Sequence, residues 1–539
     1  MTGAPITPAA LHAALRAGGE LALLDVREQG VFGRSHILLA TNLPLSRLEL
    51  RLRDLVPRRT TPVVLCDGGD EGGGDEGRGL AARAAPKLAA AGYGDVRVLD
   101  GGVAAWGAAG FELFSGVNVP SKAFGEVVEQ RHDTPNIGAE NLKAKLDAGE
   151  NLVILDSRPF EEYRAMSIPG GIDTPGAELV YRVRDLVPDP ETLVVVNCAG
   201  RTRSIIGAQS LINAGVPNPV VALRNGTMGW HLAGFELERG AGRRYGPVGG
   251  AARSWARTAA AQVGARFGVK WIEPEDLRAW QAEAEDRTLY LLDVRDPKEY
   301  AAGHLPGALS APGGQLVQAT DRWVAVRAAR IVLVDDSAVR ATMTASWLNQ
   351  MGFPGVAVLA EGLEGGTLES GPGGAEVPEL AAAAVATVTP AALQAQAEEA
   401  FVVDLGDSLA HRAGHVPGAA WAIRARLAQA ADVPSDQPKL VFTSEDGRLA
   451  KLAAADCAAR WPDRSLAALE GGTAAWAAAG LPLVPGMETA LHPEEDVYHR
   501  PYDRETGVET AMQAYLDWEV ALAGQIERDG TLRFPEFPA

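Results

Sequence analysis

The sequence predicts an α/β fold that is repeated along the chain, each unit having a mainly parallel sheet flanked by helices. Short apolar runs that end in a polar residue predict buried parallel strands, and such runs recur four times. They end in Leu24-Asp25-Val26-Arg27, Leu155-Asp156-Ser157-Arg158, Leu292-Asp293-Val294-Arg295 and Val403-Asp404-Leu405-Gly406. Strands that alternate with helices in this way are typical of α/β layer folds.

Each unit has a second apolar strand that leads into a loop and a helix. These strands are expected at 63–66, 194–198, 331–335 and 440–443, and three units end in a glycine turn followed by Trp106, Trp230 or Trp476. The recurrence predicts four domains, at 5–115, 136–240, 263–366 and 385–485, which we call domains 1 to 4. Linkers are expected near 116–135, 241–262 and 367–380, where the composition changes.

The C-terminal extension, residues 486–539, does not repeat this pattern. It has an acidic and aromatic stretch at 494–498 and a predicted helix over 508–528. We expect it to pack on the repeats or on a second copy of the chain, which would form a homodimer.

Composition narrows the class of protein. Hydrophobic content of 47% and charged content of 22% are typical of globular chains, and 539 residues can form several cores. A net charge of −19 argues against nucleic acid or an anionic membrane as the main partner. We expect a cytoplasmic protein, because residues 1–17 lack the pattern of a secretory signal and no apolar run is long enough to span a membrane. The three cysteines are predicted to be free thiols, and no metal or organic cofactor is expected.

Taken together, four motifs resemble those of the rhodanese-like sulfurtransferase family. They are the Asp-x-Arg strand end, the turn Gly303-His304-Leu305-Pro306-Gly307, the loop around Cys198 and the Gly-Gly-x-x-x-Trp ending. The resemblance covers about residues 5–485. It implies that a cysteine takes a sulfane sulfur from a small anionic donor such as thiosulfate and holds it as a persulfide. The sulfur then passes to an acceptor such as cyanide or a thiol.

Cys198 is the predicted nucleophile. It follows a buried strand and precedes a helix, where free backbone N–H groups and the helix dipole favour an anion. Arg201 and Arg203 add positive charge that favours the thiolate and attracts an anionic donor, and Gly200 permits the tight turn. The donor is therefore expected to contact the loop residues Ala199, Gly200, Arg201, Thr202 and Arg203.

Two candidate residues also have simpler explanations. A cysteine at the end of an apolar strand is often an inert buried thiol, and only the neighbouring arginines and glycine favour reactivity for Cys198. Arg158 is a further candidate for donor binding. It could equally form a structural ion pair with Asp156 and with Glu161 or Glu162.

The other three domains are predicted to be inactive. Asp335 takes the cysteine position in domain 3, and alignment puts Thr443 there in domain 4, while Cys457 reads as a core residue. In domain 1, Cys66 is placed at the nucleophile position, but the loop after it, residues 67–78, is rich in acids and glycines. Such a loop would raise the pKa of the Cys66 thiol, leaving a regulatory or sulfur-relay role open.

Parts of the sequence are also compatible with two other functions, a cysteine-dependent phosphatase or arsenate reductase and a non-enzymatic scaffold or sensor. Dual-specificity phosphatases and arsenate reductases also use a cysteine at a loop–helix junction, but with one further residue before the clamping arginine, where this chain has Ser204. The shorter loop favours a sulfur atom over a phosphate. A scaffold or a sensor of reactive sulfur is the non-enzymatic alternative. Thiosulfate is the preferred donor, with 3-mercaptopyruvate and polysulfide left open.

Overall fold

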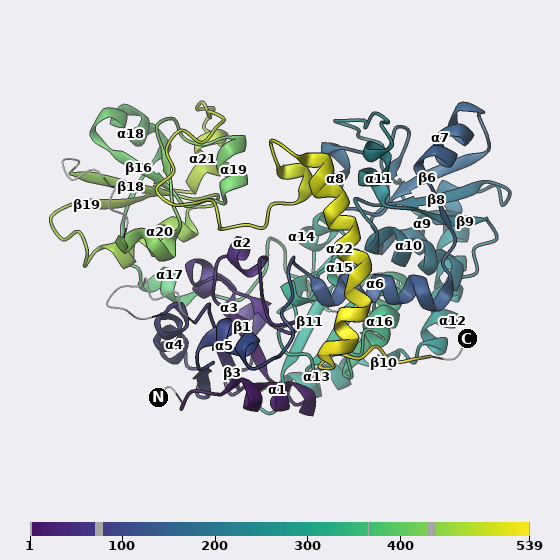
Figure 1. Ribbon diagram of the computed structural model, residues 1–539, viewed down its shortest axis with the longest axis horizontal. Helices are drawn as coiled ribbons and strands as arrows, with labels where there is room; N and C mark the ends of the chain where they lie inside the picture. The colour runs from purple at the N-terminus through teal and green to yellow at the C-terminus, as the bar shows by residue number, and fades with distance from the viewer. Residues whose placement is uncertain (1–2, 70–78, 365, 430–432, 434–437, 538–539) are drawn as a thin grey trace.

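The computed structural model describes residues 3–69, 79–364, 366–429, 433 and 438–537. Within these residues the strands form four separate sheets, one in each predicted domain, and the paired strands are parallel. Helices lie on both faces of the sheets (Figure 1). The predicted α/β class and its fourfold repetition are confirmed.

Domain 2 has the sheet order β5-β9-β8-β6-β7. Its strands are β5 (Asn136–Ile137), β6 (Leu152–Asp156), β7 (Ile172–Asp173), β8 (Leu193–Asn197) and β9 (Val220–Leu223). Its helices are α7 (Ala139–Asp147), α8 (Phe160–Ala165), α9 (Glu178–Leu186), α10 (Thr202–Asn213) and α11 (Gly226–Leu232). Helices cover both faces of the sheet, so the central strands β6 and β8 are apolar along nearly their whole length.

Domains 3 and 4 repeat that strand order, as β10-β14-β13-β11-β12 and β15-β19-β18-β16-β17. Domain 3 contains β10 (Lys270–Ile272), α13 (Pro274–Ala282), β11 (Leu289–Asp293), α14 (Pro297–Ala302), β12 (Leu309–Ser310), α15 (Gly313–Gln318), β13 (Arg330–Val334), α16 (Val339–Gln350) and β14 (Val356–Leu359). Domain 4 contains β15 (Ala386–Val388), α18 (Pro390–Ala395), β16 (Phe401–Asp404), α19 (Ser408–Ala413), β17 (Ala420–Trp421), β18 (Lys439–Thr443), α20 (Arg448–Cys457), β19 (Ser465–Leu469) and α21 (Gly472–Ala478).

Domain 1 has a shorter sheet, of order β2-β1-β3-β4. Its elements are α1 (Pro8–Ala17), β1 (Ala22–Asp25), α2 (Gln29–Phe32), β2 (Thr41–Asn42), α3 (Leu48–Leu55), β3 (Val63–Cys66), α4 (Leu80–Ala90), β4 (Val96–Val98) and α5 (Gly102–Ala108). A single parallel bridge between Ile6 and Leu99 stands where the other domains have their first strand.

The predicted linkers are largely helical. The segment 116–135 holds α6 (Val119–His132), and 241–262 leads into α12 (Gly250–Arg266), which packs between α9 and α16. The segment 367–380 runs into the short helix α17 (Pro378–Ala382). Interpreting these segments as simple linkers was wrong for the first two, because both bury one face against neighbouring domains.

The C-terminal extension forms the long helix α22 (Val508–Asp529), which runs down the centre of the molecule in yellow (Figure 1). It contacts α6 and α11, so it packs on the repeats, the first of the two expected arrangements. No helix in the described part of the chain is long and apolar enough to cross a membrane.

The domains share cores instead of standing apart. One apolar cluster joins domains 1 and 3, and a second joins domains 2 and 3 through α12. At the first junction the hydroxyl of Tyr290 donates to the carbonyl of Leu55 at 2.6 Å. Shared cores hold the domains in fixed relative positions, which allows several of them to line one cavity.

Candidate active site

Cys198 lies between the end of β8 and the start of α10, as the sequence predicts, and is 2% exposed. Its Sγ lies 3.5 Å from the hydroxyl oxygen of Ser204, and that hydroxyl donates to the carbonyl of Arg201 at 2.8 Å. A hydroxyl hydrogen rotates freely, so Ser204 can also donate to a Cys198 thiolate. The first amides of α10 have no partner inside the helix and are available to an anion at the same place.

The loop is held from below by the first turn of α11. The N–H of Thr227 donates to the carbonyl of Cys198 at 2.8 Å, and that of Met228 to the carbonyl of Ala199 at 3.0 Å. Gly226 makes this approach possible, because a Cβ there would lie 2.3 Å from the carbonyl oxygen of Cys198 and its φ is +55°. The glycine turn before Trp230 is thus part of the site's support.

Both arginines of the loop are engaged by carboxylates. Arg201 donates to both oxygens of Glu126 at 2.7 Å and also contacts Glu129. Arg203 donates to Glu162 at 2.8 and 3.1 Å, while its Nε is buried and has no partner among the residues that the structure describes. These ion pairs fix the guanidinium groups beside the loop and neutralise much of their charge.

Arg158 has a different environment. It is fully buried and donates to both oxygens of Asp156, at 2.9 and 2.7 Å, and to the carbonyl of Met166 at 2.6 Å. It does not line the cavity at Cys198. The same contacts recur at Arg27 and Arg295, where they tie the strand end to the following turn, so the geometry favours the structural explanation.

Cys198 opens onto a cavity of about 410 Å³ that is built from all four domains and the C-terminal extension. The predicted loop residues Ala199, Gly200, Arg201, Thr202 and Arg203 all line it. Outside domain 2 the lining includes Gln29 of domain 1, Lys122 of α6, Gln315 and Arg322 of domain 3, Asp407 of domain 4, and Tyr498, Arg500, Tyr502, Tyr515 and Glu519 of the extension. Sequence reasoning missed this outer wall, because no local pattern marks residues that only meet in the fold.

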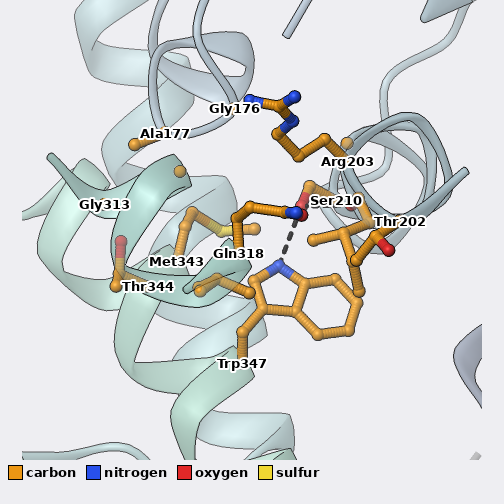
Figure 2. Close-up of a pocket in the computed structure, with 14 residues that line it drawn as sticks. Gly176, Ala177, Thr202, Arg203, Ser210, Gly313, Gln318, Met343, Thr344 and Trp347 are labelled. Atoms are coloured by element: carbon orange, nitrogen blue, oxygen red, sulfur yellow. Dashed lines mark hydrogen bonds between the residues drawn. The ribbon is translucent and has the colours of Figure 1, made fainter. Parts of the chain in front are cut away.

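A second pocket lies behind the loop, between domains 2 and 3 (Figure 2). It is lined by Ala177, Met343 and Trp347 among others, and the indole N–H of Trp347 donates to Ser210 at 2.9 Å. Its volume of about 30 Å³ is the space of a single water molecule. The pocket is therefore a packing gap at the domain interface and not a substrate site.

The strand registers correct two of the predicted alignments. Asp156 pairs with Asn197, so the nucleophile stands one residue after the paired position. In domain 1 the paired residue is Cys66 itself, and in domain 4 it is Thr443. The positions equivalent to Cys198 are therefore Asp67, Asp335 and Ser444, and the assignments of Cys66 and Thr443 to the nucleophile position were wrong by one residue.

Backbone contacts support the corrected alignment. The carbonyls of Asp67 and Ser444 accept from Val103 and Thr473, each at 2.8 Å, as the carbonyl of Cys198 accepts from Thr227. The two errors have different causes. Cys198 is 42 positions after Asp156, and the same step from Asp25 gives Asp67, so Cys66, at 41 positions, is one residue short. In domain 4 the segment from Asp404 to its strand partner Thr443 is two residues shorter than the one from Asp156 to Asn197. The Asp335 alignment in domain 3 was correct.

Cys66 is the last residue of β3 and fully buried in the core of domain 1. Burial, together with the neighbouring Asp25, raises the pKa of the Cys66 thiol well above its usual value. Burial also raises the pKa of Cys457, inside α20, to about 12. The acidic loop that was expected to affect Cys66 falls mostly on residues 70–78, which lie outside the described residues.

In domain 3 the equivalent loop holds a carboxylate where domain 2 has its thiol. Asp335 accepts from the backbone N–H groups of Ala338 at 2.6 Å, Arg340 at 2.9 Å and Ala341 at 3.4 Å, and from the hydroxyl of Ser337 at 3.0 Å. Burial raises the pKa of Asp335 from its usual value, an effect that Arg340 and these donors oppose. This turn therefore directs several hydrogen-bond donors to the one position that Cys198 occupies in domain 2.

Comparisons with known proteins agree with this geometry. The Rhodanese-like domain family matches residues 7–109, 138–233 and 273–369. A solved structure of a thiosulfate sulfurtransferase from Pseudomonas aeruginosa is similar over 99% of this chain and 100% of that one, with 50% sequence identity and a TM-score of 0.92. Domain 4 lies outside the family matches, yet it has the same strand order.

Two curated relatives match a single domain's length. The HTH-type transcriptional regulator Rv0324 of Mycobacterium tuberculosis is 36% identical over 111 residues, 21% of this chain and 45% of that protein. The putative sulfur carrier protein YrkF of Bacillus subtilis is 33% identical over 102 residues, 18% of this chain and 54% of that protein. The chain thus spans about half the length of each of these relatives.

Proposed function

The chain belongs to the rhodanese-like domain family and is an enzyme of that type, and we propose that it carries sulfane sulfur from thiosulfate to a thiophilic acceptor through a persulfide on Cys198. Cyanide and small thiols are the proposed acceptors. The proposed donor site consists of Ala199, Gly200, Arg201, Thr202 and Arg203. Arg158 is left out of the proposed site, because its Nε and one Nη are bonded to Asp156 and Met166 and it does not line the cavity, although its other Nη is buried without a partner among the described residues.

One observation carries the proposal. The loop of domain 3 has the same position after the strand and before the helix, and its amides bind the carboxylate of Asp335. The loop of domain 2 has a thiol at that place, so the same amides are available to a thiolate or to the terminal sulfur of a persulfide. Amide dipoles at a helix N-terminus stabilise such anions without requiring any rearrangement during the reaction.

The reaction follows from this arrangement in two steps. The Cys198 thiolate attacks the outer sulfur of the thiosulfate dianion, a sulfur–sulfur bond forms, and the bond to the sulfonate sulfur breaks. The electron pair of that bond leaves with the sulfite dianion, and Cys198 retains an anionic persulfide. Cyanide then attacks the terminal sulfur, which yields thiocyanate and restores the Cys198 thiolate.

The loop arginines support this chemistry from the side. Arg203 has a buried Nε without a partner in the described structure, and the charge of Cys198 is among the influences on its pKa, which Glu162 raises against the effect of burial. Arg203 can therefore stabilise the negative charge that develops on the sulfur bound to Cys198. Arg201, bound to Glu126 and Glu129, primarily holds the loop against α6.

Steady-state kinetics on Cys198→Ser beside Cys66→Ser test the proposal, with thiosulfate and 3-mercaptopyruvate as competing donors. We expect Cys198→Ser to lose transfer to cyanide with thiosulfate, and Cys66→Ser to keep it, because only the first thiol lines the cavity. Activity that survives in Cys198→Ser would contradict the proposal. A higher kcat/KM for 3-mercaptopyruvate than for thiosulfate would make 3-mercaptopyruvate the donor. Turnover of a phosphate ester would favour the phosphatase alternative.

A further inference from the structure

Part of the cavity wall beside the catalytic loop comes from α6 and the C-terminal extension. Lys122 of α6, Tyr502 and Tyr515 all line the same cavity as Cys198. Gly125 of α6 packs so tightly on the loop that a Cβ there would lie 2.8 Å from the Cγ2 of Thr202. Helix α6 and the extension are therefore in direct contact with the catalytic loop.

Lys122 is held in a fully formed network. Its ammonium donates to the hydroxyl of Tyr515 and, at 3.1 Å, to Glu519, and it lies 4.7 Å from the centre of the Tyr515 ring. Only 5% of its side chain is exposed. An ammonium has three donors, and this network uses two of them, so a third N–H remains for a ligand in the cavity.

Glu519 links this network to the catalytic loop. It accepts from Thr202, the first residue of α10, at 3.2 Å, and from the hydroxyl of Tyr515 at 3.3 Å. Its second oxygen is buried without a partner in the described structure and lies over Gly200, where a Cβ would come within 3.0 Å. Glu519 thus positions both Lys122 and the loop, and acts as a positioning residue.

The two tyrosines have different roles: the single O–H of Tyr515 is donated to Glu519, whereas Tyr502 lines the cavity and can donate to a ligand there. Burial raises the pKa of Tyr502 to about 12, and burial together with Glu519 raises the pKa of Tyr515 well above its usual value. Both hydroxyls therefore keep their protons at neutral pH. Tyr502 is also among the groups that influence the pKa of Arg203, as Cys198 is, which places all three groups within electrostatic reach of one another.

The loop arginines are paired with carboxylates, as Lys122 is with Glu519, so each cation has only its remaining N–H groups for the donor. Three carboxylates, those of Glu126, Glu129 and Glu162, bind Arg201 and Arg203. A sulfonate that approaches Cys198 brings three oxygens and a charge that becomes a full dianion on the departing sulfite. The loop amides bind the sulfur end of the donor, so the sulfonate oxygens require hydrogen-bond donors elsewhere in the cavity.

We propose that Lys122 and Tyr502 form a subsite for the sulfonate oxygens of the sulfur donor, with Tyr515 and Glu519 as residues that position Lys122, so that α6 and the C-terminal extension complete the active site of domain 2. The inference rests on the proposed function and goes beyond it by assigning residues outside the catalytic loop. When the sulfur–sulfur bond breaks, these donors receive the charge that develops on sulfite. A donor with sulfane sulfur but no sulfonate gains nothing from the subsite.

The test compares two donors. Sulfur loading of Cys198 is measured with thiosulfate and with inorganic polysulfide on the full-length wild type, Tyr502→Phe and Tyr515→Phe. We expect kcat/KM for thiosulfate to fall roughly 10- to 100-fold in Tyr502→Phe, the range expected for a lost hydrogen bond to a charged group, and to fall less in Tyr515→Phe, which removes a partner of Lys122. Loading from polysulfide should change by less than about threefold, and inhibition by sulfite should weaken in parallel with the loss for thiosulfate.

Lys122 is tested together with its partner. Lys122→Met alone would leave Glu519 as a buried unpaired charge, so the double variant Lys122→Met/Glu519→Gln removes both charges at once. It should show the same selective loss. Tyr93→Phe, which removes a buried hydroxyl bonded to the carbonyl of Val56 in domain 1, and Lys143→Met/Asp147→Asn, which removes an exposed pair on α7, are the matched controls and should load normally.

The outcomes separate the subsite from the proposed function. An equal loss with both donors would mean that these residues only support the fold, and unchanged loading from thiosulfate would mean that they do not touch it. Either result overturns the subsite. A wild type that loads sulfur from neither donor would instead contradict the proposed function itself.

Discussion

The loops of domains 2 and 3 occupy the same place between a central strand and a helix but differ in sequence and backbone. Residues 198–203 and 335–340 share only the final arginine, and φ is −119° at Arg201 but +62° at the equivalent Ala338. Each begins one residue after the strand partner of the preceding aspartate, and each leads into a helix of 12 residues. Arg203 pairs with Glu162 in domain 2, and Arg340 pairs with Glu299 at the equivalent place in domain 3. At its first position, one loop presents the thiol of Cys198 and the other the carboxylate of Asp335.

The ability of such a loop to bind an anion is independent of whether it carries a nucleophile. A loop that binds a carboxylate through its amides is an anion site whether or not it carries a nucleophile, and in domain 3 that site is filled by its own side chain. The Arg–Glu pair is common to both loops, so it belongs to the support of the turn. Reactivity therefore depends on the sulfur atom and on the surrounding cavity.

The cavities around the two loops differ in charge. The cavity of about 360 Å³ at Asp335 is lined by three further acids, Asp336, Glu361 and Glu364, and by one base, Arg257. The cavity at Cys198 is lined by five bases, Lys122, Arg201, Arg203, Arg322 and Arg500, and by four acids, Glu162, Asp407, Asp503 and Glu519. An anionic donor is favoured only at the second.

The largest expected effect comes from converting the loop of domain 2 into that of domain 3. Cys198→Asp should reduce kcat for thiosulfate by at least about a thousandfold, because the nucleophile is lost. Thermal stability should change little, because the domain 2 amides equivalent to those that bind Asp335 in domain 3 can bind the new carboxylate. Activity and melting temperature are measured on the same preparation, and a variant that fails to fold would contradict the idea of a shared anion site.

The reverse change tests the role of the surrounding charge. Asp335→Cys should give a second thiol that neutral iodoacetamide alkylates at least about tenfold faster than Cys66, because amides surround it and a cavity reaches it. Thiosulfate should not load it, since the acidic lining repels a dianion. Peptide mass spectrometry distinguishes the two cysteines. Efficient loading by thiosulfate at position 335 would show that the amides alone suffice.

The three native thiols should differ in reactivity. The raised pKa values of Cys66 and of Cys457, the latter about 12, keep both protonated at neutral pH. Their alkylation should therefore rise about tenfold with each unit of pH across the range from 7 to 9, as far as burial permits, because the thiolate is the reacting form. Cys198 should be alkylated first at pH 7. Preferential labelling of Cys66 would break the comparison between the loops.

The smallest expected effect concerns the shared Arg–Glu pair. Burial alone would raise the pKa of Glu162, but Arg203 lowers it to about 2 from an ordinary 4.5. A depressed carboxyl pKa contributes stability above pH 4.5, and this contribution is lost as the pH falls toward 2. Glu162→Gln should lower stability by about 1–2 kcal/mol at pH 7, with the difference from wild type closing in that window. A gap that stays constant with pH would contradict this pairing.

The sequence predicts the repeated fold and the position of Cys198, because strand ends and the cysteine loop are local patterns. Register was harder, because a cysteine at the end of β3 suggests the nucleophile position although equal spacing from Asp25 points to Asp67, and Cys66 was therefore placed one residue out. In domain 4, Gly406 stands where the other domains have arginine, and His411 binds Asp404 at 2.8 Å in its place. The sequence shows that the arginine is absent but not that His411 takes over its contact with Asp404.

The outer wall of the cavity could not be predicted. Lys122 lies in a segment that reads as a linker, and Tyr502 and Tyr515 lie in an extension without a repeat. They meet Cys198 only because the domains share cores and α22 packs on α6. Such contacts depend on the arrangement of whole domains, which periodicity and motif spacing do not encode.

Mass spectrometry of the full-length protein tests the central claim most directly. After incubation with thiosulfate and then with cyanide, the peptide containing Cys198 is predicted to gain the mass of one sulfur atom and then to lose it, while the peptides of Cys66 and Cys457 stay unchanged. A Cys198 peptide that never gains sulfur, or that keeps it in the presence of cyanide, would contradict transfer and favour a scaffold or a sensor.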